Sequence, residues 1–281
     1  MIPAPVSADM IKAFLSTFVA ADPNATARCA QLINGSAVSP AQHAQDVFPW
    51  RNLFAGLALG GRKGYYVESG ANYAVKGSNT WFYDRCLGWP GLCVEPMKTY
   101  HAGLQQHRTC ALAPHCISPR DGEQTTMSRG GPLSHVGGGP RGVTVTCHTL
   151  RSLLQMHHGG RHGPHHAQHE RATASRVARV GAPPPQQQRE HETVVDFWSL
   201  DVEGLELSIL ESLDGWRGNG LRVRAVLVED NKLDSRRLDD VMGRAGYRVY
   251  ARFLADTLYV RRPNPRPPTP QPADPATEPE A

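Results

Sequence analysis

The chain has 281 residues, of which 40% are hydrophobic and 20% charged, a balance typical of folded proteins rather than disordered or fibrous ones. The formal net charge is only +4, and Arg is interspersed with Asp and Glu, which argues against a nucleic-acid partner. No apolar run is long enough to span a bilayer, so we expect no membrane span.

The first part of the chain predicts two helices and a strand. Apolar side chains recur at helical spacing over residues 8–20, and a second helical run covers residues 40–59. The tyrosine-rich residues 64–67 predict a strand. We interpret residues 1–39 as an N-terminal helical extension.

Helices and strands then alternate. Residues 78–87 predict a helix with Ser78 as its N-cap, residues 92–94 a strand and residues 99–107 another helix. Residues 110–117 predict a third, broken strand. This alternation indicates a right-handed parallel α/β sheet.

The middle of the chain changes character. Residues 143–146 predict a short strand and residues 150–154 the start of a helix. Residues 155–193 are a His-, Pro- and Gln-rich insertion of low complexity. Its histidines lack carboxylates or thiolates at structural-site spacing, so we expect no metal site. They include His157, His158, His162, His165, His166 and His169.

Order resumes with a fourth strand at residues 194–200 and a helix at 205–213. A fifth strand is predicted at residues 223–228, followed by a helix at 238–245. Residues 247–260 resemble a hairpin that closes the sheet edge. The Pro-rich residues 263–281 predict a disordered tail.

Six cysteines are scattered over these predicted elements, without a Cys-x-x-Cys pair. In a chain of this length, such scatter favours reduced, buried thiols, with a Cys110–Cys116 pair left open. The N-terminus has no basic cluster before an apolar stretch, so we expect a cytoplasmic protein, an organelle address staying open. Nothing in the sequence indicates an oligomeric state.

Polar residues follow the predicted strands, at the sheet edge where open α/β sheets bind ligands. Gly70 permits a tight turn there, and Glu95 can accept hydrogen bonds from both hydroxyls of a ribose. A lone acidic strand end is often only solvated, so the ordered series is the stronger indication. Its members are Glu68, Glu95, Ser118, Asp201 and Glu229.

Three ligand classes fit such a site: a dinucleotide, a phosphate-rich nucleotide or an adenosyl group. The Gly-x-Gly-x-x-Gly fingerprint is absent because Asn72 and Tyr73 follow Gly70-Ala71, and there is no Gly-Lys-Ser or Gly-Lys-Thr phosphate loop. An acidic residue before the turn suits a cationic, phosphate-free ligand such as S-adenosylmethionine.

Several segments, in their order along the chain, resemble the FkbM-type S-adenosylmethionine-dependent methyltransferases. Residues 66–72 (Tyr-Val-Glu-Ser-Gly-Ala-Asn) and 87–96 (Leu-Gly-Trp-Pro-Gly-Leu-Cys-Val-Glu-Pro) carry the first part of the resemblance. Residues 77–82 (Gly-Ser-Asn-Thr-Trp-Phe) and 197–206 (Phe-Trp-Ser-Leu-Asp-Val-Glu-Gly-Leu-Glu) carry a further part. Residues 44–46 (Ala-Gln-Asp) resemble the family's lead-in segment and residues 256–260 (Asp-Thr-Leu-Tyr-Val) its closing strand. Residues 40–262 then form the methyltransferase domain.

The resemblance implies a Rossmann-like methyltransferase fold: a mostly parallel seven-stranded sheet with an antiparallel last strand and helices on both faces. It also implies methyl transfer from S-adenosylmethionine to a hydroxyl oxygen, here of a small-molecule or glycan acceptor. Two alternatives remain, a non-catalytic binding or scaffold relative and a nicotinamide-dependent oxidoreductase.

The same resemblance assigns site residues. Glu68 stands where the family more often has Asp, and Pro119 where it often has Asp. Candidates for the base that removes the hydroxyl proton are Asp201, Glu203 and Glu229. The residues implied in cofactor binding are Glu68, Gly70, Ala71, Asn72, Ser78, Asn79, Glu95, Pro96 and Ser118.

Overall fold

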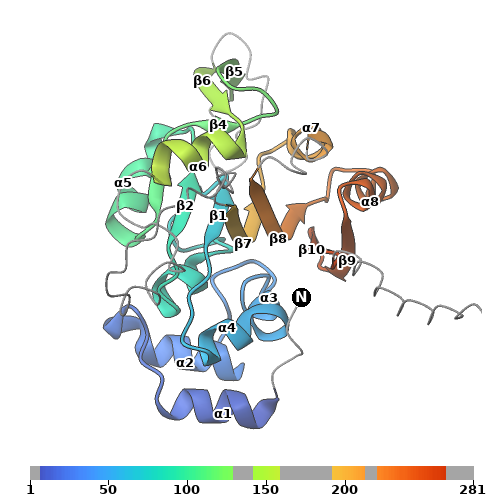
Figure 1. The fold of residues 1–281 in the computed structure, drawn as a ribbon. Helices are drawn as coiled ribbons and strands as arrows, with labels where there is room; N and C mark the ends of the chain where they lie inside the picture. Colours follow the sequence, from blue (N-terminus) through green and yellow to red (C-terminus); the bar gives the residue numbers. More distant parts are fainter. Residues whose placement is uncertain (1–6, 129–141, 159–191, 213–219, 264–281) are drawn as a thin grey trace, which may run out of the picture.

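A seven-stranded sheet forms the centre of the protein. The computed structural model describes residues 7–128, 142–158, 192–212 and 220–263. The strands of the sheet are β1 (Tyr66–Ser69), β2 (Gly91–Val94), β3 (Ala111–Ala113), β7 (Thr193–Leu200), β8 (Leu221–Glu229), β9 (Tyr247–Arg252) and β10 (Asp256–Arg261). Their spatial order is β3-β2-β1-β7-β8-β10-β9. Figure 1 labels the strands from β2 to β9 of this order.

The direction of the strands confirms the predicted α/β sheet. β3, β2, β1, β7 and β8 pair in parallel, whereas β10 runs antiparallel to both β8 and β9. From β1 the chain builds outward to β3 and then returns to β7 on the other side of β1. The strand order therefore reverses between β1 and β7, which is where open α/β sheets bind ligands.

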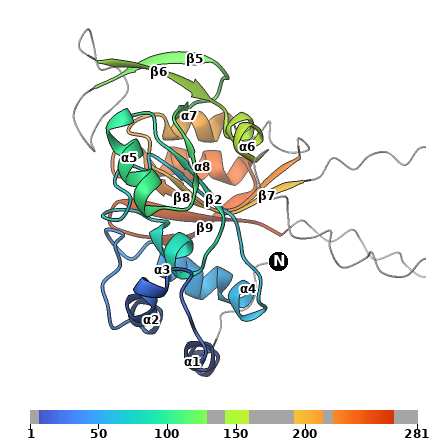
Figure 2. The same ribbon diagram turned by 90° about the vertical axis from the view of Figure 1, so that its left-hand side faces the viewer.

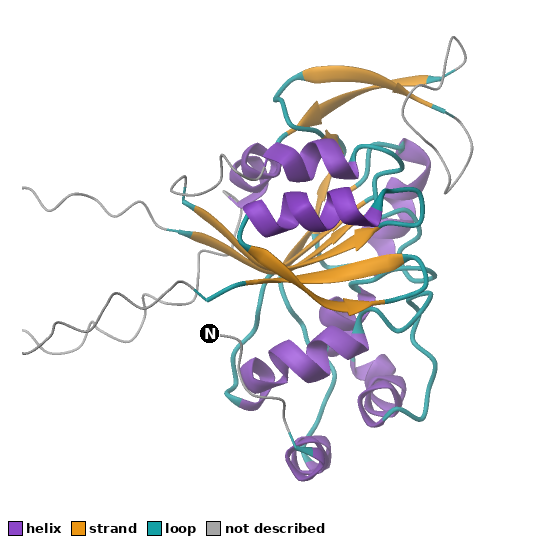
Figure 3. Cartoon of the chain, turned by 90° about the vertical axis from the view of Figure 1, so that its right-hand side faces the viewer, coloured by secondary structure: helices purple, strands orange, loops and turns teal. Residues whose placement is uncertain are grey.

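Helices cover both faces of this sheet, as predicted (Figures 2 and 3). The N-terminal helices pack with η3 on one face, and α6, α7 and α8 pack on the other. The elements are α1 (Ala8–Ser16), η1 (Pro23–Ala25), α2 (Thr26–Asn34), α3 (Val47–Pro49), η2 (Trp50–Phe54), α4 (Ala55–Leu59), η3 (Phe82–Cys86), α5 (Lys98–His107), α6 (Leu150–His158), α7 (Glu206–Glu211) and α8 (Ser235–Arg244).

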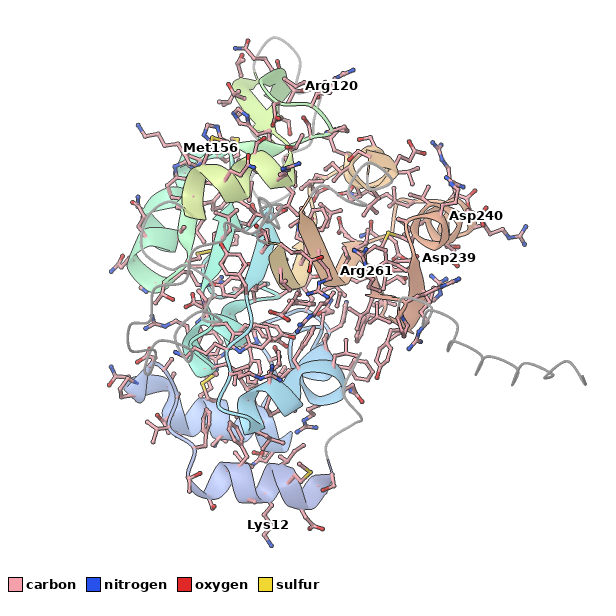
Figure 4. The ribbon with its side chains drawn as sticks, in the orientation of Figure 1. Lys12, Arg120, Met156, Asp239, Asp240 and Arg261 are labelled. Carbon is pink, nitrogen blue, oxygen red and sulfur yellow. A yellow bond between two sulfur atoms is a disulfide. The ribbon has the colours of Figure 1, made fainter. Side chains whose placement is uncertain are left out.

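A second, three-stranded sheet lies above the carboxyl ends of the main strands. It consists of β4 (Cys116–Ile117), β5 (Glu123–Met127) and β6 (Val143–His148), in the order β4-β6-β5. In Figure 4, Arg120 marks this sheet at the end of the molecule opposite Lys12 of α1. The single broken strand predicted over residues 110–117 is therefore wrong, because its two halves pair with different partners.

The prediction of reduced, buried thiols is also wrong. The six cysteines form three disulfides, Cys29–Cys86, Cys93–Cys110 and Cys116–Cys147. The partners are 57, 17 and 31 residues apart, so the fold, rather than sequence spacing, brings them together. The alternative Cys110–Cys116 pair does not form.

Within the described ranges, no helix is long and apolar enough to cross a bilayer. Most of the predicted insertion at residues 155–193 and of the predicted tail at residues 263–281 lies outside the described residues, as do the insertion histidines from His162 onward.

Candidate functional site

A pocket opens at the carboxyl ends of β1, β2 and β7, where the strand order reverses. It encloses about 480 Å³, part of which is open to solvent. The turn after β1 contributes Gly70 and Asn72, and the segment after β7 contributes residues 201–203 and Leu205. Val94 ends β2 and residues 95–97 follow it, and Cys116, Ile117 and Met127 come from the small sheet.

The turn after β1 requires glycine at position 70. Gly70 has a φ of +79°, and a Cβ atom there would lie 1.8 Å from the carbonyl oxygen of Asp201. The amide of Gly70 donates to the carbonyl of Val94 at 3.0 Å, so the turn is also tied to β2. Ala71, 2% exposed, is bound the same way. Absence of a side chain at Gly70 thus lets the predicted β1 and β7 motifs meet.

Glu95 is a buried carboxylate in the pocket wall. It is 2% exposed and accepts hydrogen bonds from the amides of Asn72, at 2.9 Å, and Met97, at 2.7 Å. Burial raises its pKa to about 7. Each carboxylate oxygen keeps a further lone pair, so the side chain can still accept hydrogen bonds from a ligand. Pro96 lines the pocket beside it.

Glu68 differs from the sequence-based expectation, since it does not line the pocket. Its carboxylate accepts hydrogen bonds from the Ser78 hydroxyl at 2.9 Å, the Asn79 amide at 2.8 Å and the Thr80 hydroxyl at 2.8 Å. Arg108 adds an ion pair at 3.0 Å. Glu68, Ser78 and Asn79 therefore stabilise the turn after β1 without lining the pocket.

Arg108 is the residue of this network that the sequence did not reveal. Its side chain is fully buried and bridges Glu68 and Asp84, the latter at 2.6 Å. It also donates to the hydroxyls of Ser78 and Thr80. Sequence alone offered no signal beyond a charged residue between a predicted helix and a strand.

Three acidic side chains converge at the other side of the pocket. Carboxylate oxygens of Asp201, Glu203 and Glu229 all lie within 4.8 Å of one another. Burial and the neighbouring Glu229 raise the pKa of Asp201 far above its ordinary value, and burial raises the pKa of Glu229. These raised pKa values favour the protonated form of Asp201 at neutral pH, while Lys232 pairs with Glu203 at 2.5 Å.

This crowding has two chemical uses. Asp201 Oδ1 is buried without a hydrogen-bond partner in the described structure, so it has room for a donor from a ligand. Oxygen-only donors of this kind also suit a hard divalent cation. Glu229 belongs to the acidic group but does not line the pocket itself.

Ser118 does not face the pocket. It is 3% exposed, and its hydroxyl donates to the carbonyl of Arg120 at 2.8 Å. The neighbouring Ile117 lines the pocket instead, together with Met97 and Met127. The end of the pocket expected to hold an adenine is thus an apolar wall, which the sequence did not indicate because β5 was not predicted.

Comparison with known proteins leaves the family open. No protein-family model matches the chain, and neither a curated protein nor a solved structure is significantly similar to it. The class defined by fold and site is an α/β protein with an acidic pocket at the switch point of its sheet.

Proposed function

We propose that the protein is an S-adenosylmethionine-dependent O-methyltransferase of FkbM type with a Rossmann-like methyltransferase fold. The observation that carries this proposal is a pocket lined by carboxyl groups and by no basic group among the described residues. Its ionisable lining residues are Glu95, Asp201 and Glu203, and none of the described lining residues is basic. A ligand with phosphates would need positive partners, whereas a cationic, phosphate-free ligand suits this lining.

The residues present fit this cofactor. Glu95 has free lone pairs for the two ribose hydroxyls. The unpartnered Oδ1 of Asp201 can accept from the ammonium group of the methionine moiety. Met97, Ile117 and Met127 offer an apolar surface for the flat adenine ring.

Positioning and proton removal are the tasks of the protein in this reaction. When bound, S-adenosylmethionine supplies a methyl group already activated by the sulfonium. Glu95 and the Gly70 turn would hold the cofactor so that its methyl group faces an acceptor for in-line attack. Once Asp201 has lost its proton, it can accept the proton of the acceptor hydroxyl.

The acceptor class in this proposal is a hydroxyl of a small molecule or a glycan. A non-catalytic binding or scaffold protein is the second candidate. The raised pKa of Asp201 favours it, because a protonated carboxyl cannot act as a base. A nicotinamide-dependent oxidoreductase is disfavoured because a dinucleotide carries phosphates, and the pocket lining offers them no positive charge.

A methyl-transfer screen separates these candidates. The full-length chain is incubated with methyl-labelled S-adenosylmethionine and fractionated cell extract, and labelled products are detected by mass spectrometry. We expect label on a hydroxyl oxygen, and at least ~100-fold less label with Asp201→Asn. Tight cofactor binding without transfer to any fraction would favour the scaffold function.

A further inference from the structure

The small sheet that walls the pocket has very little core of its own. It places Cys116, Ile117 and Met127 in the pocket lining. Its buried core among the described residues is Cys116, Met127, Val145 and Cys147. Two of these four are joined as a disulfide. Because so small a core gains little from apolar burial, the covalent bond is a main source of its order.

The position of this bond adds to its effect. Cys116 and Cys147 are directly paired residues of β4 and β6, with Cα atoms 4.2 Å apart. β4 has only two residues, so hydrogen bonds alone hold it weakly. The bond closes a loop of 31 residues and therefore restricts the unfolded chain strongly.

The Cys93–Cys110 disulfide lies next to a second segment of the pocket wall. Cys93 lies two residues before Glu95, and Cys110 directly precedes β3. The amide of Glu95 donates to the carbonyl of Ala113 in β3 at 3.0 Å. Two of the three disulfides thus fix segments that line the pocket.

We propose that ligand binding in this pocket is controlled by oxidation, with Cys116–Cys147 as the controlling bond. This inference rests on the proposed function, because it takes the pocket as the S-adenosylmethionine site. On oxidation the two thiols lose two electrons and two protons, and a partner disulfide takes them up to become two thiols. Reduction frees β4 from β6 and loosens the wall that holds the ligand.

A consequence concerns the compartment. Cytosolic reductants keep most protein thiols reduced, so the complete pocket forms in an oxidising compartment. Within this proposal, that compartment replaces the cytoplasm expected from the sequence, and hydroxyl-bearing acceptors are those found there.

The test compares two variants that each lose one disulfide. Cys147→Ser breaks the pocket bond but keeps the sulfur of Cys116 in the wall. The matched control Cys29→Ser/Cys86→Ser breaks the bond between α2 and η3, neither of which lines the pocket. Disulfides of the isolated full-length protein are mapped by mass spectrometry, and binding of S-adenosylmethionine is measured by calorimetry.

We expect mapped disulfides and a Kd raised ~10-fold or more by Cys147→Ser, with the control close to wild type. Six free thiols in protein isolated without reductant, equal affinity for all forms, or equal losses in both variants would overturn the proposal. If the wild-type protein binds no S-adenosylmethionine, the proposed function fails. Hydrogen exchange of Cys147→Ser is then compared with that of the wild type. Faster exchange in β4–β6 but not in β7 supports oxidative control, and unchanged exchange overturns it.

Discussion

Glu95 offers a sharp test of the site because its ionisation and its ligand are linked. Burial raises its pKa to about 7, and ribose hydroxyls donate best to the ionised form. Affinity for S-adenosylmethionine should therefore fall as the pH drops below about 7, where binding must first expel a proton. Calorimetry across this pH range measures the effect.

The matched variants sharpen this prediction. Glu95→Gln keeps the shape but not the charge, so we expect a Kd raised ~10-fold or more and a flat pH dependence. Glu211→Gln, an exposed change on α7, should bind as the wild type does. An unchanged Kd for Glu95→Gln would refute the ribose contact.

The Asp201–Glu229 pair predicts the pH dependence of turnover. Burial raises both pKa values, and Glu229 raises that of Asp201 further, so Asp201 becomes a proton acceptor only as the pH rises. Once a methyl acceptor has been identified, kcat should increase as the pH rises above neutrality. Asp201→Asn should lower kcat ~100-fold or more while changing the cofactor Kd little. A kcat that depends neither on the pH nor on Asp201→Asn would leave positioning as the source of catalysis.

The turn after β1 depends on a buried ion-pair network for its support. Removing the charge of Glu68 leaves Arg108 buried with Asp84 as its sole acidic partner among the described residues. Glu68→Gln should thus lower the free energy of unfolding by about 3–5 kcal/mol in urea titrations. The half-exposed pair of Arg237 and Glu211 provides the control, and its removal should cost less than about 1 kcal/mol. Equal effects would contradict a supporting role for Glu68.

Strands that carry continuous apolar residues were predictable from sequence. β1 and β2 are buried along their whole length, and β7 and β8 over most of theirs, so hydrophobic runs bounded by Gly and acidic residues identified them. β5 was missed because its sequence, Glu-Gln-Thr-Thr-Met, is polar and mostly half-buried.

Contacts between distant segments were beyond the sequence. The predicted helix at residues 40–59 begins only at Val47, whose amide donates to the carboxylate of Asp46 at 2.7 Å. Of the predicted site residues, Gly70, Asn72, Glu95, Pro96, Asp201 and Glu203 line one pocket. Arg108 and the cysteine pairs were missed because their partners are separated by 17 residues or more.

The whole molecule carries several buried carboxyls whose burial raises their pKa: Asp46 and Asp256 to about 6, and Glu95 to about 7. In the unfolded chain they ionise near their ordinary values of 3.8 and 4.5. At a pH between the unfolded and the folded pKa values, the folded state therefore binds more protons than the unfolded state. The stability falls as the pH rises through that window. Carboxyls with a lowered pKa, such as Asp121, change the stability only at more acidic pH.

Urea unfolding should accordingly give a larger free energy of unfolding near pH ~5 than near pH ~8. Asp46→Asn removes one of these carboxyls and should flatten the dependence. A stability that rises steadily from the lower to the higher pH would show that these groups are not held protonated in the folded state.

Calorimetry with S-adenosylmethionine on the oxidised, full-length protein tests the cofactor assignment, on which the proposed function depends. The acidic pocket predicts binding of one cofactor per chain, and weaker binding by Glu95→Gln. It also predicts no binding of a phosphate-bearing dinucleotide such as NAD. Absence of S-adenosylmethionine binding to protein that is folded by circular dichroism would contradict the methyltransferase assignment.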